Sequence, residues 1–191
     1  MSQLRMIWKP ENPRTYKGVP AGFSVRSMTY ADIDGWCEVS RALTGENRWS
    51  NEEFIRNMLY NPPLTLLPRD IYCLFDDEAE VMVSTAAACL DTERHLGNLH
   101  MVSASPEYRG RGIGRAVCEA AVECFVRHGV TEATLSTDEF RVPAIKIYLG
   151  LGFRPWLYEE DMPARWRGVF NDMGMTDPQK AYTAEKEDTT V

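Results

Sequence analysis

The chain has 191 residues, of which 44% are hydrophobic and 26% are charged, and its formal net charge at pH 7 is -7. This length suits one folded domain with a sizeable core, and the composition excludes a largely disordered chain. The excess of acidic side chains argues against non-specific binding to nucleic acid, which requires a basic surface. We therefore expect a globular protein that has no nucleic-acid partner.

The five cysteines indicate a reduced, cytoplasmic protein. Their number is odd, none forms a C-x-x-C pair, and they show no metal-ligand spacing with the three histidines. We therefore expect neither a metal site nor a cysteine that is paired with a histidine. No apolar run approaches the ~20 residues of a membrane span, and the N-terminus lacks the apolar stretch of a signal peptide. We expect no membrane association.

Hydrophobic periodicity predicts a mixed α/β chain. Residues 1–22, rich in proline and charge, are expected to form an irregular arm, residues 23–171 a single domain, and residues 172–191 a polar, flexible tail. In chain order the domain is expected to contain a strand at 23–28, helices at 29–43 and 50–60, strands at 71–75, 80–90 and 98–105, a helix at 113–128, a strand at 132–137, a helix at 143–151 and a strand at 153–159.

Cap residues mark where several of these helices begin and end. Ser50 followed by Glu53 is the signature of a capping box. Gly129 ends the long helix. In the helix predicted at 143–151, Pro143 suits the first turn and Gly152 suits the C-terminal end. The apolar residues of the long helix recur on one face, which is expected to pack on the sheet: Ile113, Ala116, Val117, Ala120, Ala121 and Cys124.

The segment SPEYRGRGIGRA, residues 105–116, concentrates three glycines and three arginines within seven residues. Glycines let successive backbone N–H groups point into one concavity, and the positive end of the following helix adds to it, so the segment suits a phosphate group. The same composition also suits a tight turn with solvated arginines. A Walker loop is disfavoured because the Lys-Ser/Thr pair is missing, and G-x-G-x-G departs from the dinucleotide fingerprint G-x-G-x-x-G.

Three motifs in the same order resemble those of the GCN5-related N-acetyltransferases, the GNAT family. RGRGIG at 109–114 matches the signature R/Q-x-x-G-x-G/A, AIKIYLGLGF at 144–153 resembles the closing element A-x-x-x-Y-x-x-x-G-F, and FSVRSMTYADIDGW at 23–36 resembles the opening strand and helix. The resemblance covers residues 23–158. It implies the fold of the family, a mixed, mostly antiparallel central sheet that is flanked by helices and splayed at the acetyl-CoA site.

The resemblance also implies how acetyl-CoA, the cosubstrate, would be held. Backbone groups of the glycine-rich loop would bind its pyrophosphate, the backbone of Val102 and Ala104 would pair with the pantetheine arm, and N–H groups near Val102 would polarise the thioester carbonyl. Arg141 replaces an asparagine that is common in the family; it is expected to reach a phosphate, and Thr137 or Asp138 is expected to supply the lost hydrogen bond. The predicted cofactor-binding residues are Val102, Ala104, Arg109, Gly110, Arg111, Gly112, Ile113, Gly114, Arg115 and Arg141.

Two residues carry the chemistry that the resemblance implies. Tyr148 matches the family tyrosine that protonates the departing thiolate. His100 is the candidate base for the proton of the amine, at a position where serotonin N-acetyltransferases also carry a histidine. Structural alternatives stay open: Tyr148 also suits a core aromatic, and His100 a half-buried histidine bonded to a neighbour. Asp91 and Glu93 are weaker candidates for the base.

The sequence therefore predicts an acyltransferase that moves an acetyl group from acetyl-CoA to a primary amine by direct attack in a ternary complex. The alternatives are a non-catalytic acyl-CoA-binding sensor or interaction module and a nucleotide-phosphate binder. The acceptor is expected to be a small-molecule or peptide amine, with cationic acceptors favoured by the acidic chain. The protein is expected to be a monomer or a homodimer. Four aromatic residues would either line the acceptor pocket or pack in the core: Trp36, Trp49, Phe54 and Tyr60.

Overall fold

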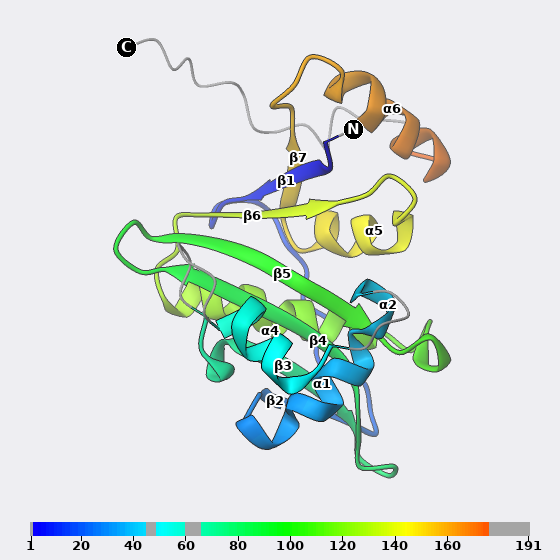
Figure 1. Cartoon of the computed structure of the whole chain (residues 1–191). Helices are drawn as coiled ribbons and strands as arrows, with labels where there is room; N and C mark the ends of the chain where they lie inside the picture. Colours follow the sequence, from blue (N-terminus) through cyan, green and yellow to red (C-terminus); the bar gives the residue numbers. More distant parts are fainter. Residues whose placement is uncertain (1, 45–48, 60–65, 176–191) are drawn as a thin grey trace. The chain divides into compact units, whose positions relative to one another are not determined.

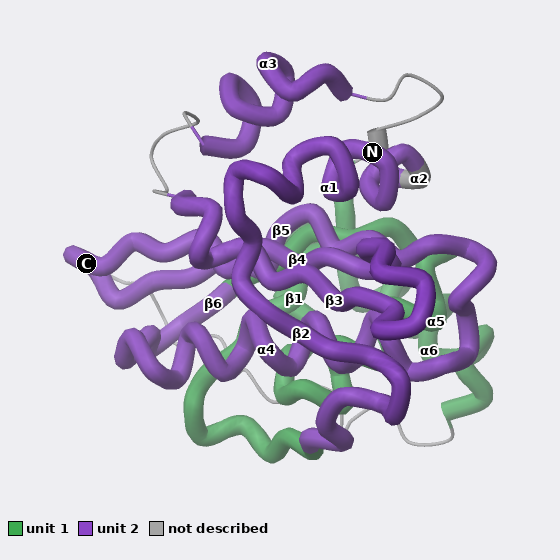
Figure 2. The backbone as a smooth tube through the Cα atoms, turned by 90° about the horizontal axis from the view of Figure 1, so that it is seen from below, with its two compact units in different colours: residues 1–15, 134–191 green, residues 16–133 purple. Residues whose placement is uncertain are grey.

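The computed structural model describes residues 2–44, 49–59 and 66–175 of the chain. The chain forms two compact units, each of which has its own set of elements (Figure 2). Unit 1 comprises residues 1–15 and 134–191, and unit 2 comprises residues 16–133.

Unit 2 contains four antiparallel strands, which neighbour one another in the order β2 (Phe23–Ser27), β3 (Ile71–Asp76), β4 (Val81–Asp91) and β5 (Leu96–Ala104). Both predicted turns between these strands are present. Asp76 Oδ1 accepts hydrogen bonds from the backbone N–H groups of Glu78 and Ala79, and Asp91 Oδ1 accepts one from that of Arg94. These carboxylates stabilise the two turns because they accept hydrogen bonds from backbone N–H groups that the strands leave unpaired.

Short helical segments connect β2 to β3 (Figure 1): η1 (Tyr30–Asp32), α1 (Ile33–Val39), α2 (Arg41–Thr44), α3 (Asn51–Phe54), the π-helical turn η2 (Ile55–Leu59) and η3 (Pro68–Asp70). The predicted capping box of α3 is confirmed. The N–H of Glu53 donates to Ser50 Oγ over 3.2 Å, and the N–H of Ser50 donates to a Glu53 carboxylate oxygen over 2.8 Å. Tyr60, the last residue of that predicted helix, lies outside the described residues.

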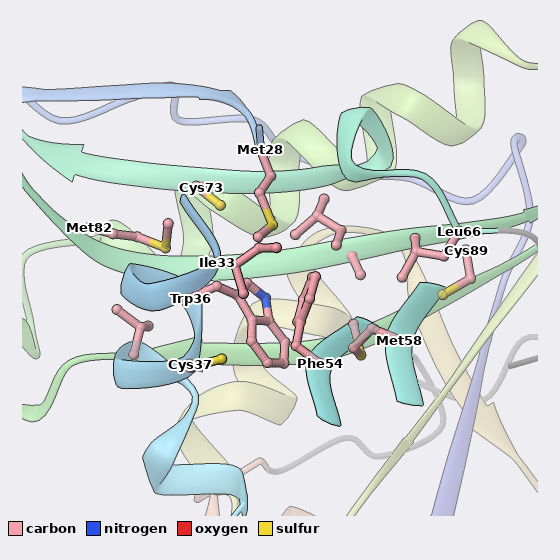
Figure 3. Close-up of a cluster of buried hydrophobic side chains, with 13 residues drawn as sticks. Met28, Ile33, Trp36, Cys37, Phe54, Met58, Leu66, Cys73, Met82 and Cys89 are labelled. Atoms are coloured by element: carbon pink, nitrogen blue, oxygen red, sulfur yellow. The ribbon is translucent and has the colours of Figure 1, made fainter. Parts of the chain in front are cut away.

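Helices cover both faces of the strands of unit 2. After the 3₁₀ turn η4 (Pro106–Tyr108), α4 (Ile113–Arg127) packs against β3, β4 and β5, and α1 packs against β4. Figure 2 shows α4 on one side of these strands and α1 and α3 on the other. A cluster of buried side chains that includes Trp36 and Phe54 fills the space between these helices and the strands (Figure 3). Each fully buried large side chain stabilises the fold by roughly 1.5–3 kcal/mol.

The apolar stripe predicted for α4 is confirmed. Its members are buried except Ala120, which is partly buried. The helix also ends where the sequence predicts, because His128 is its C-cap and Gly129 adopts a φ of 63°.

Unit 1 pairs a strand near the start of the chain with one from its C-terminal part. β1 (Leu4–Trp8) pairs antiparallel with β7 (Phe153–Trp156), and the remaining elements are β6 (Glu132–Thr137), which begins in unit 2, α5 (Val142–Gly150) and α6 (Met162–Asp172). The expectation that the arm is irregular is wrong for residues 4–8, and α6 has no counterpart in the sequence prediction. Four of the five residues of β1 are buried, so this strand lacks the alternation that reveals a half-buried one.

In both units, antiparallel strands are combined with helices. This confirms the predicted fold class. The splay of the sheet at the acetyl-CoA site and the boundaries of a single domain at 23–171 stay predictions. Most of the predicted tail, residues 176–191, lies outside the described residues.

Candidate active site

A β-bulge interrupts β5 at the residues expected to meet the pantetheine arm. The pairing with β4 is regular up to His100 and again from Ser103, so that Met101 and Val102 both lie opposite Ala86. Met101 has a φ of 47°, in the left-handed region that residues with a side chain rarely adopt. The extra residue of a bulge is left out of the ladder, so β5 has backbone groups to offer a ligand here.

Two buried serines hold β5 in place just after the bulge. The hydroxyl of Ser84 on β4 donates to the carbonyl oxygen of Ser103 over 2.7 Å, and the hydroxyl of Ser103 donates to the carbonyl oxygen of Val39 in α1 over 2.7 Å. A buried hydrogen bond of this kind contributes roughly 1 kcal/mol. The two bonds therefore position the strand segment that carries Val102 and Ala104, which are both partly buried.

His100 immediately precedes the bulge. Its side chain is exposed in surface area, yet the surrounding protein removes enough water to lower the pKa of its imidazole below the ordinary value. The neutral ring that results at neutral pH is the protonation state that a general base needs. The alternative bases lie at the end of β4 and in the turn that follows it, where Asp91 binds Arg94 and Glu93 is exposed.

The glycine-rich segment forms the predicted turn between β5 and α4. Gly110 and Gly112 have φ values of 79° and 82°, which only glycine adopts readily. Gly112 is the N-cap of α4 and offers no side-chain cap. The N–H groups at Ile113 and Gly114 therefore find no side-chain acceptor in that residue, and the positive end of the helix dipole lies beside them. This backbone fits a phosphate group.

The arginines of the loop differ in their surroundings. Arg109 is exposed. The guanidinium of Arg111 lies 4.5 Å from the ring centroid of Phe23 and 5.0 Å from that of Tyr108, and one of its nitrogens is 3.9 Å from an Asp76 carboxylate oxygen. The rings and the carboxylate hold this half-exposed cation next to the loop.

Arg115 is not a solvated arginine. Its Nε donates to Glu119 Oε1 over 2.9 Å, and the exposed fractions of the two side chains are 16% and 5%. Sequence reasoning missed Glu119, although its i,i+4 spacing from Arg115 on a predicted helix was a signal for the pair.

Two of the predicted site residues, Tyr148 and Arg141, belong to unit 1. Tyr148 on α5 is buried, and its ring centroid lies 6.2 Å from that of Phe153 in an edge-on arrangement. Arg141 is the N-cap of α5, and its Nε lies 3.1 Å from Asp138 Oδ2. The other oxygen of Asp138 accepts a hydrogen bond from Gln3. The predicted roles of Tyr148 and Arg141 in the reaction stay predictions.

The expectation that no cysteine is paired with a histidine is wrong for Cys124. Its Sγ lies 3.5 Å from Nδ1 of His128, one helical turn further on, and the same Nδ1 is 2.9 Å from the carbonyl oxygen of Cys124. Cys124 is fully buried, and burial raises the pKa of its thiol. The pair therefore has a structural role in α4 rather than the exposed thiolate of a nucleophile.

Two of the four aromatic residues considered for an acceptor pocket are core residues. Trp36 and Phe54 are fully buried, with ring centroids 4.7 Å apart (Figure 3). The ring centroid of Trp49 lies 5.9 Å from that of Trp36. Tyr60 lies outside the described residues. Core packing therefore accounts for Trp36 and Phe54.

In the part of the chain that the structure describes, no helix is both long and apolar enough to span a membrane. Across residues 2–44, 49–59 and 66–175, no three His, Cys, Asp or Glu side chains gather as metal ligands. The expectations about metal, membrane and nucleic acid stay predictions.

Comparison with known proteins identifies the family to which the chain belongs. Residues 36–153 match the model of the Acetyltransferase (GNAT) family. The chain is 34% identical over 61 residues to the mycothiol acetyltransferase of Thermobispora bispora, and this alignment covers 32% of this chain and 21% of that protein. The chain is 24% identical over 143 residues to the mycothiol acetyltransferase of Clavibacter michiganensis subsp. michiganensis, and this alignment covers 71% of this chain and 44% of that protein.

A solved GCN5-related N-acetyltransferase from Sphaerobacter thermophilus shares the fold, with a TM-score of 0.55 at 17% identity over 87% of this chain and 48% of that one. Because the family model covers more than half of the chain, the chain belongs to the GNAT acetyltransferase family. The resemblance seen in its motifs is thereby confirmed. The match spans less than half the length of the two curated relatives.

Proposed function

We propose that the protein transfers an acetyl group from acetyl-CoA to a primary amine, by direct attack of the amine in a ternary complex. One observation carries the proposal: a bulged strand leads into a turn with left-handed glycines at 110 and 112, and then into a helix whose N-cap offers no side chain. This order of features suits a ligand that has a chain able to pair with a strand and, next to it, a phosphate group.

Acetyl-CoA supplies the acetyl group as a thioester when it is bound. Backbone groups from Arg109 to Arg115 hold the pyrophosphate in this proposal, and those of Val102 and Ala104 pair with the pantetheine arm. Arg109 and Arg111 contribute positive charge, whereas the side chain of Arg115 is already neutralised by Glu119. Arg141 is proposed to reach a phosphate group, and Thr137 or Asp138 is proposed to supply the hydrogen bond of the asparagine that is common in the family.

The remaining residues supply acid and base chemistry. His100 takes the proton of the attacking amine, directly or through water, and Tyr148 protonates the departing thiolate. N–H groups near Val102 polarise the thioester carbonyl. A covalent cysteine intermediate is disfavoured, because burial raises the pKa of Cys73, Cys89 and Cys118 to about 12.

The proposed acceptor is a small-molecule or peptide amine, and no metal takes part. The acidic chain favours a cationic acceptor, since opposite charges increase the rate of encounter. We further propose a cytoplasmic location and a monomeric or homodimeric state.

Calorimetry with acetyl-CoA and CoA tests the binding step. We expect the wild type to bind both and Gly112→Trp to bind neither. Gly174→Trp is the control, because Gly174 shares the left-handed φ of Gly112, at 68°, but has open space around it and lies far along the chain, after α6. Failure of the wild type to bind would refute the proposal.

Release of CoA with a panel of amines then tests the transfer step. Tyr148→Phe keeps the ring that packs against Phe153 and removes only the hydroxyl, so we expect unchanged binding of acetyl-CoA and a turnover that is lower by roughly 10²–10⁴-fold. Binding without transfer to any amine would instead favour the non-catalytic acyl-CoA-binding module.

A further inference from the structure

A buried carboxylate ties the N-terminal arm to the start of α4. Glu119 is only 4% exposed. Its Oε1 accepts hydrogen bonds from Arg115 Nε over 2.9 Å and from the backbone N–H of Lys17 over 2.8 Å, and its Oε2 accepts one from the N–H of Gly18 over 2.8 Å. The buried charge is therefore both paired and hydrogen-bonded, as a buried charge must be to be tolerated.

Backbone groups of the arm make these contacts. Two successive N–H groups converge on one carboxylate, which is the geometry of an anion-binding nest, and Gly18 has the left-handed φ of 75° that such a nest often uses. These two backbone bonds therefore anchor residues 17 and 18 of the arm to Glu119.

Beyond this anchor the arm follows the glycine-rich loop. A Cβ added at Gly112 would lie 3.4 Å from Cγ of Pro20. The ring centroid of Phe23 lies 6.1 Å from that of Tyr108 and 4.5 Å from the Arg111 guanidinium. We call residues 17–23 the strap, because Pro20 lies beside Gly112, the N-cap of α4, and Phe23 lies beside Tyr108 and Arg111.

We propose that Glu119 is a positioning residue for acetyl-CoA binding, which holds the strap against the loop and so keeps the N-terminus of α4 in a phosphate-binding conformation. This inference rests on the proposed function. A loop that is ordered in advance loses less conformational entropy when the ligand binds. This gain in affinity is expected only for ligands that bind the loop through a pyrophosphate group.

The substitution Glu119→Gln tests this role. Glutamine has the same shape, but its amide carries two donors in place of one acceptor oxygen and cannot accept hydrogen bonds from both Lys17 and Gly18 in the same way. Glu123→Gln is the matched control, because Glu123 lies one turn further along α4 and is exposed.

The two variants are compared with the wild type using two donors, acetyl-CoA and acetyl-pantetheine. The second donor has the same thioester but no pyrophosphate. For Glu119→Gln we expect the KM for acetyl-CoA to rise by about ten-fold, as for the loss of one charge-assisted hydrogen bond, with kcat unchanged. We expect kcat/KM for acetyl-pantetheine to stay at the wild-type value, and Glu123→Gln to behave as the wild type with both donors.

An equal loss with both donors, or no loss with either, would overturn the role of Glu119 and leave the proposed function in place. A wild type that uses neither donor would instead refute the proposed function, and this inference with it.

A measurement on the wild type covers the case in which Glu119→Gln fails to fold. If the strap stabilises bound acetyl-CoA, bound acetyl-CoA must stabilise the strap to the same extent, because coupling is reciprocal. We therefore expect CoA to slow hydrogen exchange at the amides of Lys17 and Gly18. Unchanged exchange at both amides, while calorimetry shows CoA bound, would overturn the inference.

Discussion

Gly97 on β5 lies so close to Phe125 on α4 that a Cβ at this glycine would be 2.9 Å from Cε1 of the ring and 3.1 Å from Cβ of Ala133. Carbon atoms in contact prefer about 3.5–4.0 Å, so only a hydrogen atom fits between the strand and the helix. The close approach positions β5, with His100 and the bulge, relative to α4.

Gly97→Ala is therefore expected to lower the free energy of unfolding by about 1–3 kcal/mol, as overpacking does in a filled core. The fully buried Phe125 has little room to move away. Gly35→Ala is the control, because its Cβ would make an ordinary 3.5 Å contact with Met82 and alanine favours a helix by up to ~1 kcal/mol over glycine. Urea unfolding measures both variants, and a Gly97→Ala variant as stable as the wild type would contradict the close approach.

The pH dependence of kcat/KM tests His100 as the base. Because the pKa of its imidazole lies below the ordinary value, of about 6.5, the neutral base persists below that pH and activity declines only as the ring becomes protonated. His100→Gln is expected to lower kcat/KM by about 10²–10⁴-fold and to remove this decline.

The control for His100 is His95→Asn in the turn before β5. His95 has a left-handed φ of 56°, which asparagine tolerates. This variant should keep the wild-type pH profile. A His100→Gln variant that retains both the activity and the acidic decline would show that another group, such as a water chain, removes the proton.

The ion pair between Arg26 and Asp32 predicts how stability depends on acid. Two guanidinium nitrogens of Arg26 donate to the Asp32 carboxylate over 2.7 and 2.8 Å, and this interaction, with further bonds from Thr29, holds the pKa of Asp32 well below its usual range. In the unfolded chain the pKa of an aspartate is about 3.9. Since the folded pKa is the lower one, the stabilisation is complete above the unfolded pKa and is lost as pH falls towards the folded pKa.

We therefore expect the free energy of unfolding of the wild type to decline below about pH 5, and that of Asp32→Asn to be lower at neutral pH but to decline less. Asp77→Asn, at an exposed aspartate in the turn between β3 and β4, should decline as the wild type does. Urea titrations between neutral and acidic pH measure all three proteins, and parallel curves for the wild type and Asp32→Asn would contradict the prediction.

Features that depend on neighbours in the sequence were predictable. The capping box of α3, the end of α4 at Gly129 and the left-handed glycines at 110 and 112 each arise from backbone groups within a few residues. The motifs of the GNAT family lie within such segments, so the sequence located the candidate phosphate loop before any contact between distant residues was known.

The features that sequence reasoning missed or left open depend on contacts. β1 pairs with β7, which lies near the other end of the described chain, and α6 buries Met162, Trp166, Val169 and Phe170. The left-handed Met101 exists because β4 and β5 differ by one residue in their pairing. The core position of Trp36 follows from its packing against Phe54, and an aromatic residue on a helix suits a pocket as well as a core until its neighbours are known.

By itself, the sequence determined the family, the order of most strands and helices, and the place of the glycine-rich loop, because hydrophobic period, caps and turn residues act over a few positions. Only the tertiary structure decided that Glu119 anchors the strap beside that loop. Lys17 and Glu119 are 102 positions apart, and a carboxylate on a helix becomes an anchor only where packing excludes water and brings N–H donors to it.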